Sequence, residues 1–455
     1  MRLRLQVIGA CFLAGCASPD RSEPAFERLP VHPSAIRQAS FEVPAPTHST
    51  EAAPQPAPFA GATELTEAEL IDAVLRRNPT IEQMTAAWQA ASTRYPQVTS
   101  LDDPRVGGSV GPGSIGSPNV DFAYRLEVSQ AFPYPGKRNL RGQSALNEAA
   151  AAGADLEDTR LQLVESARSA FADFYLIGRA TEVEEENLKL LGQFRENALA
   201  RFKAGQATVQ DSLQAEVAIA RQRERLLSLD RQRKVAQAKL NTLMHLPPDR
   251  VLPPGPKQLD RPPAVAPIEE LRERASRRPD VQALTRRVAA ESAAVDLAVK
   301  EYKPDFEVMA AYDAWWQSPE TALRPMIALR SNLPVRYARR SAAVAEAQAR
   351  LAQRRAELTR LLDRVNFEVQ EAYEQIRESE RILELYEKTT LPAARRNVDT
   401  AVTEYTVGRP FLNLIDAQKS LVELRDRYFE VSADYLRRRA ALDRAIGSRP
   451  HDNHP

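Results

Sequence analysis

The chain has 455 residues, with 62 basic and 61 acidic side chains and a formal net charge of +1. This balance argues against a nucleic-acid partner, because Lys and Arg alternate with Asp and Glu instead of gathering on one segment. A charged fraction of 27% with only 17 glycines favours long, solvent-exposed helices over a compact α/β enzyme.

The N-terminus predicts export and lipid attachment. A positively charged start precedes an apolar stretch at 5–13, which is too short to span a bilayer. The stretch ends in Leu13-Ala14-Gly15-Cys16, which looks like a bacterial lipobox, and Ala17 stands where an Asp would suggest retention at the inner membrane. We therefore expect a signal peptide at 1–15 and a covalent lipid on Cys16, at the inner leaflet of a Gram-negative outer membrane. An ordinary secretory signal is the alternative.

Two proline-rich stretches divide the rest of the chain. Residues 16–62 lack helical or strand periodicity and are interpreted as a lipidated tether. The stretch 247–267 is interpreted as a linker between two folded regions. These regions are 63–246 and 268–447, and residues 448–455 form a polar tail.

The second region repeats the first at a period of about 200 residues. Arg77-Asn78-Pro79-Thr80 returns as Arg277-Arg278-Pro279-Asp280, and Phe202-Lys203-Ala204-Gly205 returns as Tyr405-Thr406-Val407-Gly408. We expect two copies of one unit, each with two helices, two strands and two long helices. The expected helices are 65–77, 80–98, 138–203 and 207–246 in the first copy, and 268–277, 280–302, 338–405 and 410–446 in the second.

Alternating polarity marks the expected strands. From 120 to 129 every second residue is apolar, and 305–313 alternates in the same way. The stretch 323–330 is a further candidate, and 105–111 is the weakest. Apolar residues outward and charges inward are typical of an outer-membrane strand. This pattern would turn Asp121, Arg125, Glu127, Glu307 and Arg330 toward an aqueous lumen. The alternative is a sheet that packs on its own helices, with the charges in water.

Any membrane crossing would have to use these strands, because no apolar run after Leu13 approaches the length of a transmembrane helix. Four strands cannot close a barrel, and a bilayer tolerates no open sheet edge. Two chains would give eight strands, whose interior side chains fill, whereas three chains would give twelve and leave room for a pore.

Three further motifs are Leu75-Arg76-Arg77-Asn78-Pro79, Phe132-Pro133-Tyr134-Pro135-Gly136-Lys137-Arg138, and Tyr405-Thr406-Val407-Gly408 followed by Leu414-Ile415-Asp416-Ala417-Gln418. With these motifs, the lipobox and the two-fold repeat, the chain resembles the TolC family of outer-membrane efflux factors. The resemblance implies a mainly α homotrimer in which a 12-stranded outer-membrane β-barrel continues into a 12-helix periplasmic α-barrel. It also implies a periplasmic adaptor and an inner-membrane RND-type pump as partners. The run from Pro133 to Arg138 is most similar to the CzcC/CusC-type branch, which implies heavy-metal efflux.

The resemblance also implies sites at the turns between the long helices. Glycine suits such tight turns, and in the family Gly205 and Gly408 would lie at the adaptor-contacting tip. An aperture latch between Asp211 and Arg409 is implied if one gap follows Gly408, with Asn413 and Asp416 facing the pore. The alternative is that these residues form a solvated helix face.

The sequence argues against an enzyme and against a metal site. Gly111-Pro112-Gly113-Ser114-Ile115-Gly116 matches GxGxxG, but a strand follows where a dinucleotide site needs a helix. The histidines do not cluster, and a single mature cysteine cannot form a thiolate site. We expect an exit duct for an efflux pump, with no cofactor beyond the lipid. The alternatives are an outer-membrane component of type I secretion or drug efflux, a periplasmic adaptor, and a coiled-coil envelope spacer.

Overall fold

The computed structural model describes residue 59 and residues 61–116, 118, 122–205, 208–259, 264–313, 325–407 and 409–448. The chain divides into two units, Met1–Ala57 and Pro58–Pro455, and every described residue lies in the second. Cys16, Asp121 and Gly408 lie outside the described residues, as does the signal peptide expected at 1–15.

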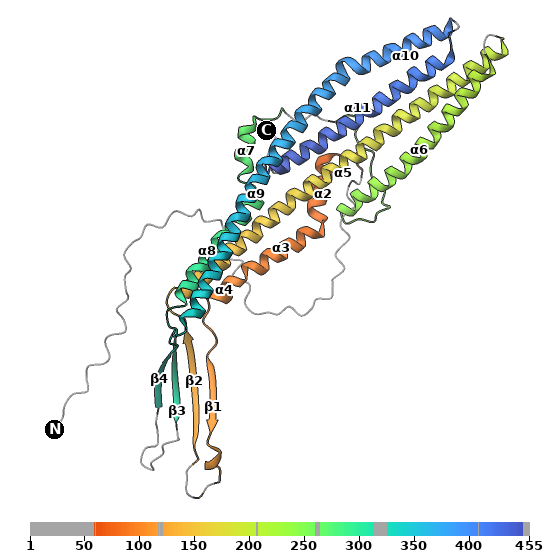
Figure 1. Ribbon diagram of the computed structural model, residues 1–455. Coiled ribbons are helices and arrows are strands. Elements are labelled where there is room, and N and C mark those ends of the chain that lie inside the picture. The colour runs from red at the N-terminus through yellow and green to blue at the C-terminus, as the bar shows by residue number, and fades with distance from the viewer. Residues whose placement is uncertain are drawn as a thin grey trace. The chain divides into compact units, whose positions relative to one another are not determined.

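The order helix, helix, strand pair, long helix, long helix occurs twice along the described chain (Figure 1). The first copy contains α2 (Glu67–Arg77), α3 (Pro79–Ser92), α4 (Arg94–Thr99), β1 (Arg105–Val110), the 3₁₀ turn η1 (Pro112–Ser114), β2 (Tyr124–Phe132), α5 (Lys137–Lys203) and α6 (Val209–Leu243). The second contains α7 (Ile268–Ala275), α8 (Pro279–Lys300), β3 (Phe306–Asp313), β4 (Pro325–Ser331), α9 (Tyr337–Leu385), the π segment η2 (Tyr386–Thr390), α10 (Leu391–Thr406) and α11 (Phe411–Ala445). The predicted helix-rich architecture with few strands is confirmed.

The starts of the short helices follow from capping. The side chain of Thr66 accepts a hydrogen bond from the amide of Glu69 at the start of α2, and that of Asn78 accepts one from Thr80 at the start of α3. Pro79 and Pro279 occupy the first turns of α3 and α8, where a missing N–H costs nothing.

Two predicted helices are interrupted. The helix expected at 80–98 breaks at Thr93, and the helix expected at 338–405 widens into the π segment before α10. A proline follows each break by a few residues. Pro96 and Pro392 lack the amide that would bond the carbonyl four residues earlier, and their rings crowd that carbonyl. The helices therefore continue only after a local change of pitch.

The four strands form one antiparallel sheet in the order β1-β2-β3-β4. Its central pair joins β2 of the first copy to β3 of the second, and β1 and β4 lie at the two edges. Val128 lies opposite Val106 on one side and Ala310 on the other, and Ala310 lies opposite Ile327. These residues therefore share one face of the sheet.

Each copy has its own apolar core where the short helix packs on the long ones. In the first copy, Leu70 and Val74 of α2 pack with Phe171 of α5 and Leu240 of α6. In the second copy, the core contains Leu271 of α7, Val369 and Ile376 of α9, and Leu442 of α11. Helix α5 contacts α6, α8 and α11 and therefore links the two copies. None of the helices in the described ranges has an apolar stretch long enough to cross a bilayer.

Candidate functional site

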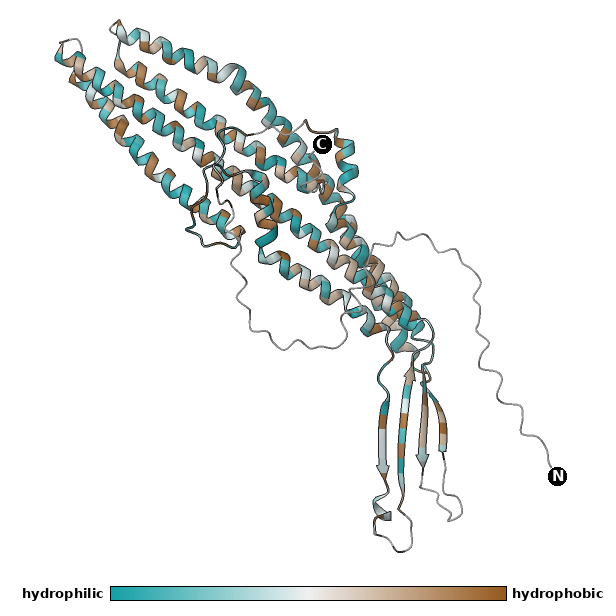
Figure 2. Ribbon diagram, turned by 180° about the vertical axis from the view of Figure 1, so that it is seen from behind, coloured by the Kyte–Doolittle hydropathy of each residue, from teal (hydrophilic) through white to brown (hydrophobic). Residues whose placement is uncertain are grey.

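One face of the sheet is apolar and exposed. Val106 and Ile327 are 80% and 83% exposed, and Leu126, Val128 and Leu329 of the same face are exposed as well. Figure 2 shows the alternation of hydrophobic and hydrophilic residues along the strands. A continuous apolar patch of this kind marks a surface that contacts a partner or a membrane.

The opposite face carries charge. Arg125 and Glu127 of β2, Glu307 of β3 and Arg330 of β4 share it by register, and Nη1 of Arg330 lies 3.9 Å from Oε2 of Glu307. The structure thus brings together four of the five residues that the sequence predicts for an aqueous face.

A glycine on β1 makes room for one of these charges. The side chain of Glu127 lies over Gly107, and a Cβ added to Gly107 would lie only 3.1 Å from Cγ of Glu127. The polar face therefore depends on a position without a side chain.

The run from Pro133 to Arg138 connects the sheet to the helices. Lys137 is fully buried, and its Nζ lies 3.0 Å from a Glu301 carboxylate oxygen and 2.9 Å from Oδ1 of Asp305. Asp305 also accepts a hydrogen bond from the amide of Tyr134, and Arg138 donates to the carbonyl of Thr99. A buried ammonium with two carboxylates and good geometry holds its neighbours firmly. The motif thus positions the strands on the start of α5.

A groove of about 620 Å³ lies between α3/α4, α5 and α8. Three arginines line it, namely Arg94, Arg141 and Arg287, together with Glu148. Arg287 forms an ion pair with Asp155 of α5. This groove could not be found from the sequence, because its arginines come from three separate segments.

The turn between α5 and α6 has the expected geometry. Gly205 adopts a φ of +70°, the left-handed conformation that favours glycine after a helix. The hydroxyl of Thr208 donates to the carboxylate of Asp211 at 3.2 Å, at the start of α6. Figure 1 shows this turn, and the one between α10 and α11, at the helix ends away from the strands.

The other three gate candidates lie at the start of α11. The amide of Arg409 donates to the carbonyl of Glu404, which closes the turn after α10. Asn413 and Asp416 are both exposed, and their spacing puts them on one side of α11. Within the described part of one protomer, no ion pair joins Arg409 to Asp211.

A different contact joins the α5–α6 helical hairpin to the α10–α11 helical hairpin near their turns. Nη1 of Arg201 donates to the carbonyl of Tyr405 at 2.6 Å, and its guanidinium lies over the Tyr405 ring, 4.5 Å from the centroid. Tyr405 and Phe194 in turn contact Phe411. This contact was not predicted from the sequence, although the aromatic residues Tyr405 and Phe411 beside the second turn are a visible signal of it.

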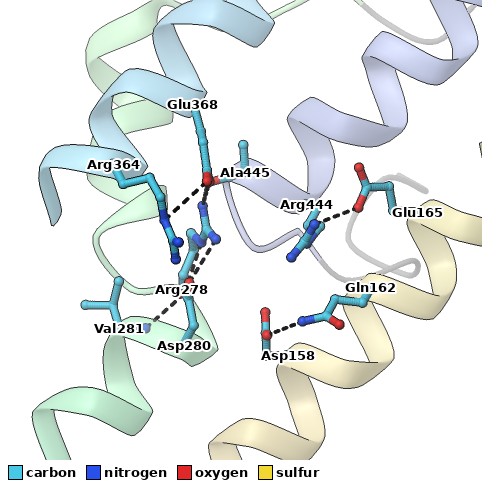
Figure 3. Close-up of polar contacts among 10 residues, drawn as sticks. All are labelled: Asp158, Gln162, Glu165, Arg278, Asp280, Val281, Arg364, Glu368, Arg444 and Ala445. Carbon is cyan, nitrogen blue, oxygen red and sulfur yellow. Dashed lines mark hydrogen bonds and ion pairs between the residues drawn. The ribbon is translucent and has the colours of Figure 1, made fainter. Parts of the chain in front are cut away.

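A buried arginine ties the start of α8 to α9 and α11 within the second copy. Arg278 is only 3% exposed and contacts Asp280 of α8, Glu368 of α9 and the carbonyl of Ala445. Burial alone would lower the pKa of Arg278, but its bonds to Glu368 and Asp280 raise it above its ordinary value. Figure 3 shows this arginine between its two carboxylates, beside the pair formed by Arg444 and Glu165.

The chain is similar to a known family over part of its length and to several solved structures. Residues 70–244 match the sequence model of the family described as outer membrane efflux protein. The solved outer-membrane channel OprN is 19% identical, with a TM-score of 0.72 over 84% of this chain and 90% of that one. CusC, whose structures concern folding and transmembrane channel formation, is 15% identical, with a TM-score of 0.72 over 84% and 92%. The outer membrane protein VceC of Vibrio cholerae is 19% identical, with a TM-score of 0.71 over 84% and 96%. No curated protein matches the chain. At these identities the solved structures show a shared fold.

Proposed function

We propose that this chain, whose residues 70–244 match the outer membrane efflux protein family, belongs to that family and forms the outer-membrane exit duct of a tripartite efflux pump. The family and its solved structural neighbours are channels, so the chain is not an enzyme. The duct conducts passively what an inner-membrane RND-type transporter and a periplasmic adaptor deliver.

The two-faced sheet carries this proposal. Its exposed apolar face, from Val106 to Ile327, has the polarity of a surface in contact with lipid, whereas Arg125, Glu127, Glu307 and Arg330 suit an aqueous interior. We also assign Asp121 to the aqueous interior, because it alternates with the apolar residues in the sequence. Asp121 lies outside the described residues.

Three copies complete the duct. The sheet has edges at β1 and β4, and lipid does not tolerate unpaired strand edges. Three sheets closing edge to edge give a 12-stranded barrel with room for a lumen. We propose that the long helices of the three copies continue it as a 12-helix periplasmic α-barrel.

Cysteine cross-linking tests the closure. Val106→Cys on β1 combined with Ile327→Cys or with Leu329→Cys on β4 should form disulfides between copies and give bands up to a trimer and no larger. Val128→Cys with Leu329→Cys is the matched control, because β3 separates β2 from β4 within one copy. Monomers alone in both edge pairs, with conducting protein present, would refute the edge-to-edge trimer.

We place the chain in the outer membrane with a lipid on Cys16 and a tether at 16–62. The lipid is an accessory anchor in this proposal, because a barrel buries more apolar surface than two or three acyl chains, each methylene contributing about 0.8 kcal/mol. Cys16→Ser should abolish labelling with a palmitate analogue and leave the protein in the outer membrane. A mutant found wholly soluble in the periplasm would exclude the barrel.

The turns at Gly205 and Gly408 are proposed to meet the adaptor. A Cβ added to Gly205 would find open space, which fits a tip available for contact. Photo-cross-linking from Gln210, which is exposed beside this turn, should capture a periplasmic protein with a helical hairpin. Capture of an unrelated envelope protein alone would argue against the adaptor contact.

The cargo is a separate question from the duct. The run from Pro133 to Arg138, which suggests a heavy-metal branch, holds the sheet on the helices through Lys137 and Arg138. In the described ranges no group of His, Cys, Asp and Glu is arranged to hold a metal ion. We propose that the pump selects the cargo, whether metal, drug or secreted protein. Deleting the gene and scoring sensitivity to metal salts and antibiotics, with protein export, distinguishes the three.

A further inference from the structure

The seam between α5 and α11 is joined mostly by pairs of opposite charge. From the core toward the turns these are Glu165–Arg444, Arg168–Asp443, Asp173–Arg437 and Glu186–Arg425. At Glu184 and Asp426 the seam instead brings two carboxyl groups together. The strength and sign of that contact depend on whether a proton is present.

Glu184 is held in place by α6. It is only 5% exposed, and its carboxylate accepts a hydrogen bond from Nε2 of Gln222, which also donates to the Glu184 carbonyl at 3.1 Å. Nε of Arg225 lies 3.6 Å from the other carboxylate oxygen. These contacts fix the position of the Glu184 carboxylate.

Asp426 faces this carboxylate from α11. Its Oδ1 is buried without a hydrogen-bond partner, while its carboxyl is within hydrogen-bonding reach of Glu184. Burial first, and then the charge of Glu184, raise the pKa of Asp426 to about 7, although Arg225 and Arg425 act in the opposite direction. Arg425 is occupied by Glu186, at 2.8 Å.

Three charged groups act on Asp426 within the described part of the chain. From α5 the facing group is Glu184, from α6 it is Arg225, and from α11 it is Arg425. The carboxylate of Glu387 on the π segment accepts instead from the hydroxyl of Tyr428.

We propose that Glu184 and Asp426 form a proton-binding site that fastens α11 to the α5–α6 hairpin when it holds a proton and loosens it when the proton leaves. With the proton, Asp426 donates to Glu184. Without it, two carboxylates face each other in a half-buried site and repel.

The direction of the pH dependence of stability follows from the raised pKa of Asp426. The ordinary value for Asp426 is 3.8, and the folded value is about 7. The contribution of Asp426 to stability is therefore fully present below 3.8 and is lost as pH rises through about 7. The seam is tighter in mildly acidic medium and weaker in mildly alkaline medium.

A layer of amides connects this site to the turns. Nε2 of Gln418 donates to Asn187 at 3.2 Å, and Nδ2 of Asn187 donates to Gln222 at 2.9 Å. The layer thus runs from α11 through α5 to α6, and Gln222 also holds Glu184. Phe411 of the hairpin contact lies two turns beyond Gln418 on α11. Loss of the proton should loosen the end of α11 where the turn lies. That consequence for conduction rests on the proposed duct, whereas the proton site does not.

Infrared spectroscopy of the purified full chain tests the site directly. Between about pH 5.5 and about pH 8.5, on either side of the pKa, the wild type should lose one carboxylic-acid C=O band per chain. Asp426→Asn should lack this change. Glu423→Gln, which removes an exposed carboxylate of the same helix, should keep it. An unchanged difference spectrum in Asp426→Asn would overturn the proposal.

A second measurement tests whether the proton site is coupled to the opening of the channel. In planar bilayers the open population of the wild type should rise with pH, by up to about tenfold for each pH unit above the pKa. Asp426→Asn should remain at the low-pH level throughout, and Glu423→Gln should follow the wild type. The same pH response in Asp426→Asn and the wild type would refute the coupling. No conductance from any variant, with the infrared change present, would instead refute the duct and leave the proton site standing.

Discussion

Asn78 and Arg278 occupy the same position in the two copies, and each donates a hydrogen bond to the last residue of the long helix that ends its copy. Nδ2 of Asn78 lies 2.9 Å from the carbonyl of Leu243, and Nη1 of Arg278 lies 3.4 Å from that of Ala445. Carbonyls at a helix C-terminus lack partners within the helix, so each side chain supplies a hydrogen bond to one such carbonyl. Arg278 also carries a buried positive charge, which the carboxylates of Asp280 and Glu368 balance.

That difference predicts unequal costs of removal. Arg278→Ala should lower the free energy of unfolding by up to about 3–5 kcal/mol, because it removes a buried guanidinium and takes this partner from Asp280, while Glu368 keeps only Arg364. Asn78→Ala should cost about 1 kcal/mol, the net value of an ordinary hydrogen bond. Denaturant titration in detergent measures both. Arg277→Ala, which breaks an exposed pair with Glu273, should change stability by less than about 1 kcal/mol. Equal costs for Arg278→Ala and Arg277→Ala would contradict this account.

The same two helix ends predict a stabilising substitution. Each ends in a residue with positive φ, which is +54° at His245 and +70° at Gly447. His245 is exposed, so its side chain contributes little packing, while a left-handed conformation costs a non-glycine residue about 1 kcal/mol or more. His245→Gly should therefore raise stability by roughly 0.5–1 kcal/mol, after the entropy that glycine adds to the unfolded chain. Thermal unfolding measures the gain, and Gly447→Ala should show the opposite sign. A less stable His245→Gly protein would show that the imidazole makes a contact of its own.

Features with a local period could be predicted from the sequence. The alternation around Leu126 and Val128 gives the exposed face of β2 correctly, because side chains in a strand alternate whatever lies next to them. Pro79 and Pro279 mark helix starts for an equally local reason. Pro392 has the same chemistry, but periodic sequence continues on both sides of it and hides the π segment.

Features that join distant segments could not be predicted. Arg201 and Tyr405 are 204 residues apart, and their contact depends on how two hairpins pack. Glu184 and Asp426 each lie in a charged helical stretch and look like solvated residues until the seam buries them. The arginines of the groove come together only through the packing of α8 on α5.

The two faces of the sheet predict opposite tolerance for a new carboxylate. Leu126→Asp should block assembly in the outer membrane, because a charge against lipid costs up to a few kcal/mol depending on depth. Ser109→Asp should assemble, since Ser109 is exposed and lies opposite Arg125 on the polar face. Heat-resistant oligomers in outer-membrane fractions report the outcome, and equal assembly of both variants would refute the assignment of faces.

The arginine groove predicts the ion preference of the duct. If the hollow face of α3/α4, α5 and α8 lines the lumen, Arg94, Arg141 and Arg287 raise the local concentration of anions. Replacing all three with Gln should shift the reversal potential in a salt gradient toward cations, and the shift should shrink at high salt. Arg231→Gln, an exposed change on α6 away from the groove, should leave the potential unchanged. An unchanged potential in the triple variant would place the groove outside the conducting path.

The last prediction concerns the aperture proposed between Gly205 and Gly408. Asp211 and Arg409 lie beside the two turns and are not paired within one described protomer, so a latch between them would have to join neighbouring copies. A guanidinium–carboxylate pair is directional, and one near solvent contributes about 1 kcal/mol or less, but a three-fold ring repeats it and could bias a two-state opening. Arg409→Ala with Asp211→Asn should raise single-channel conductance and the sensitivity of cells to large antibiotics, without dissociating the trimer. Asn replaces Asp211 because it keeps a side chain that can bond Thr208 at the start of α6. Lys419→Ala, which breaks an exposed pair on α11, is the control. Wild-type conductance in the double variant would remove the latch, and the duct would then close by other contacts, among which the Arg201–Tyr405 link is the first to test.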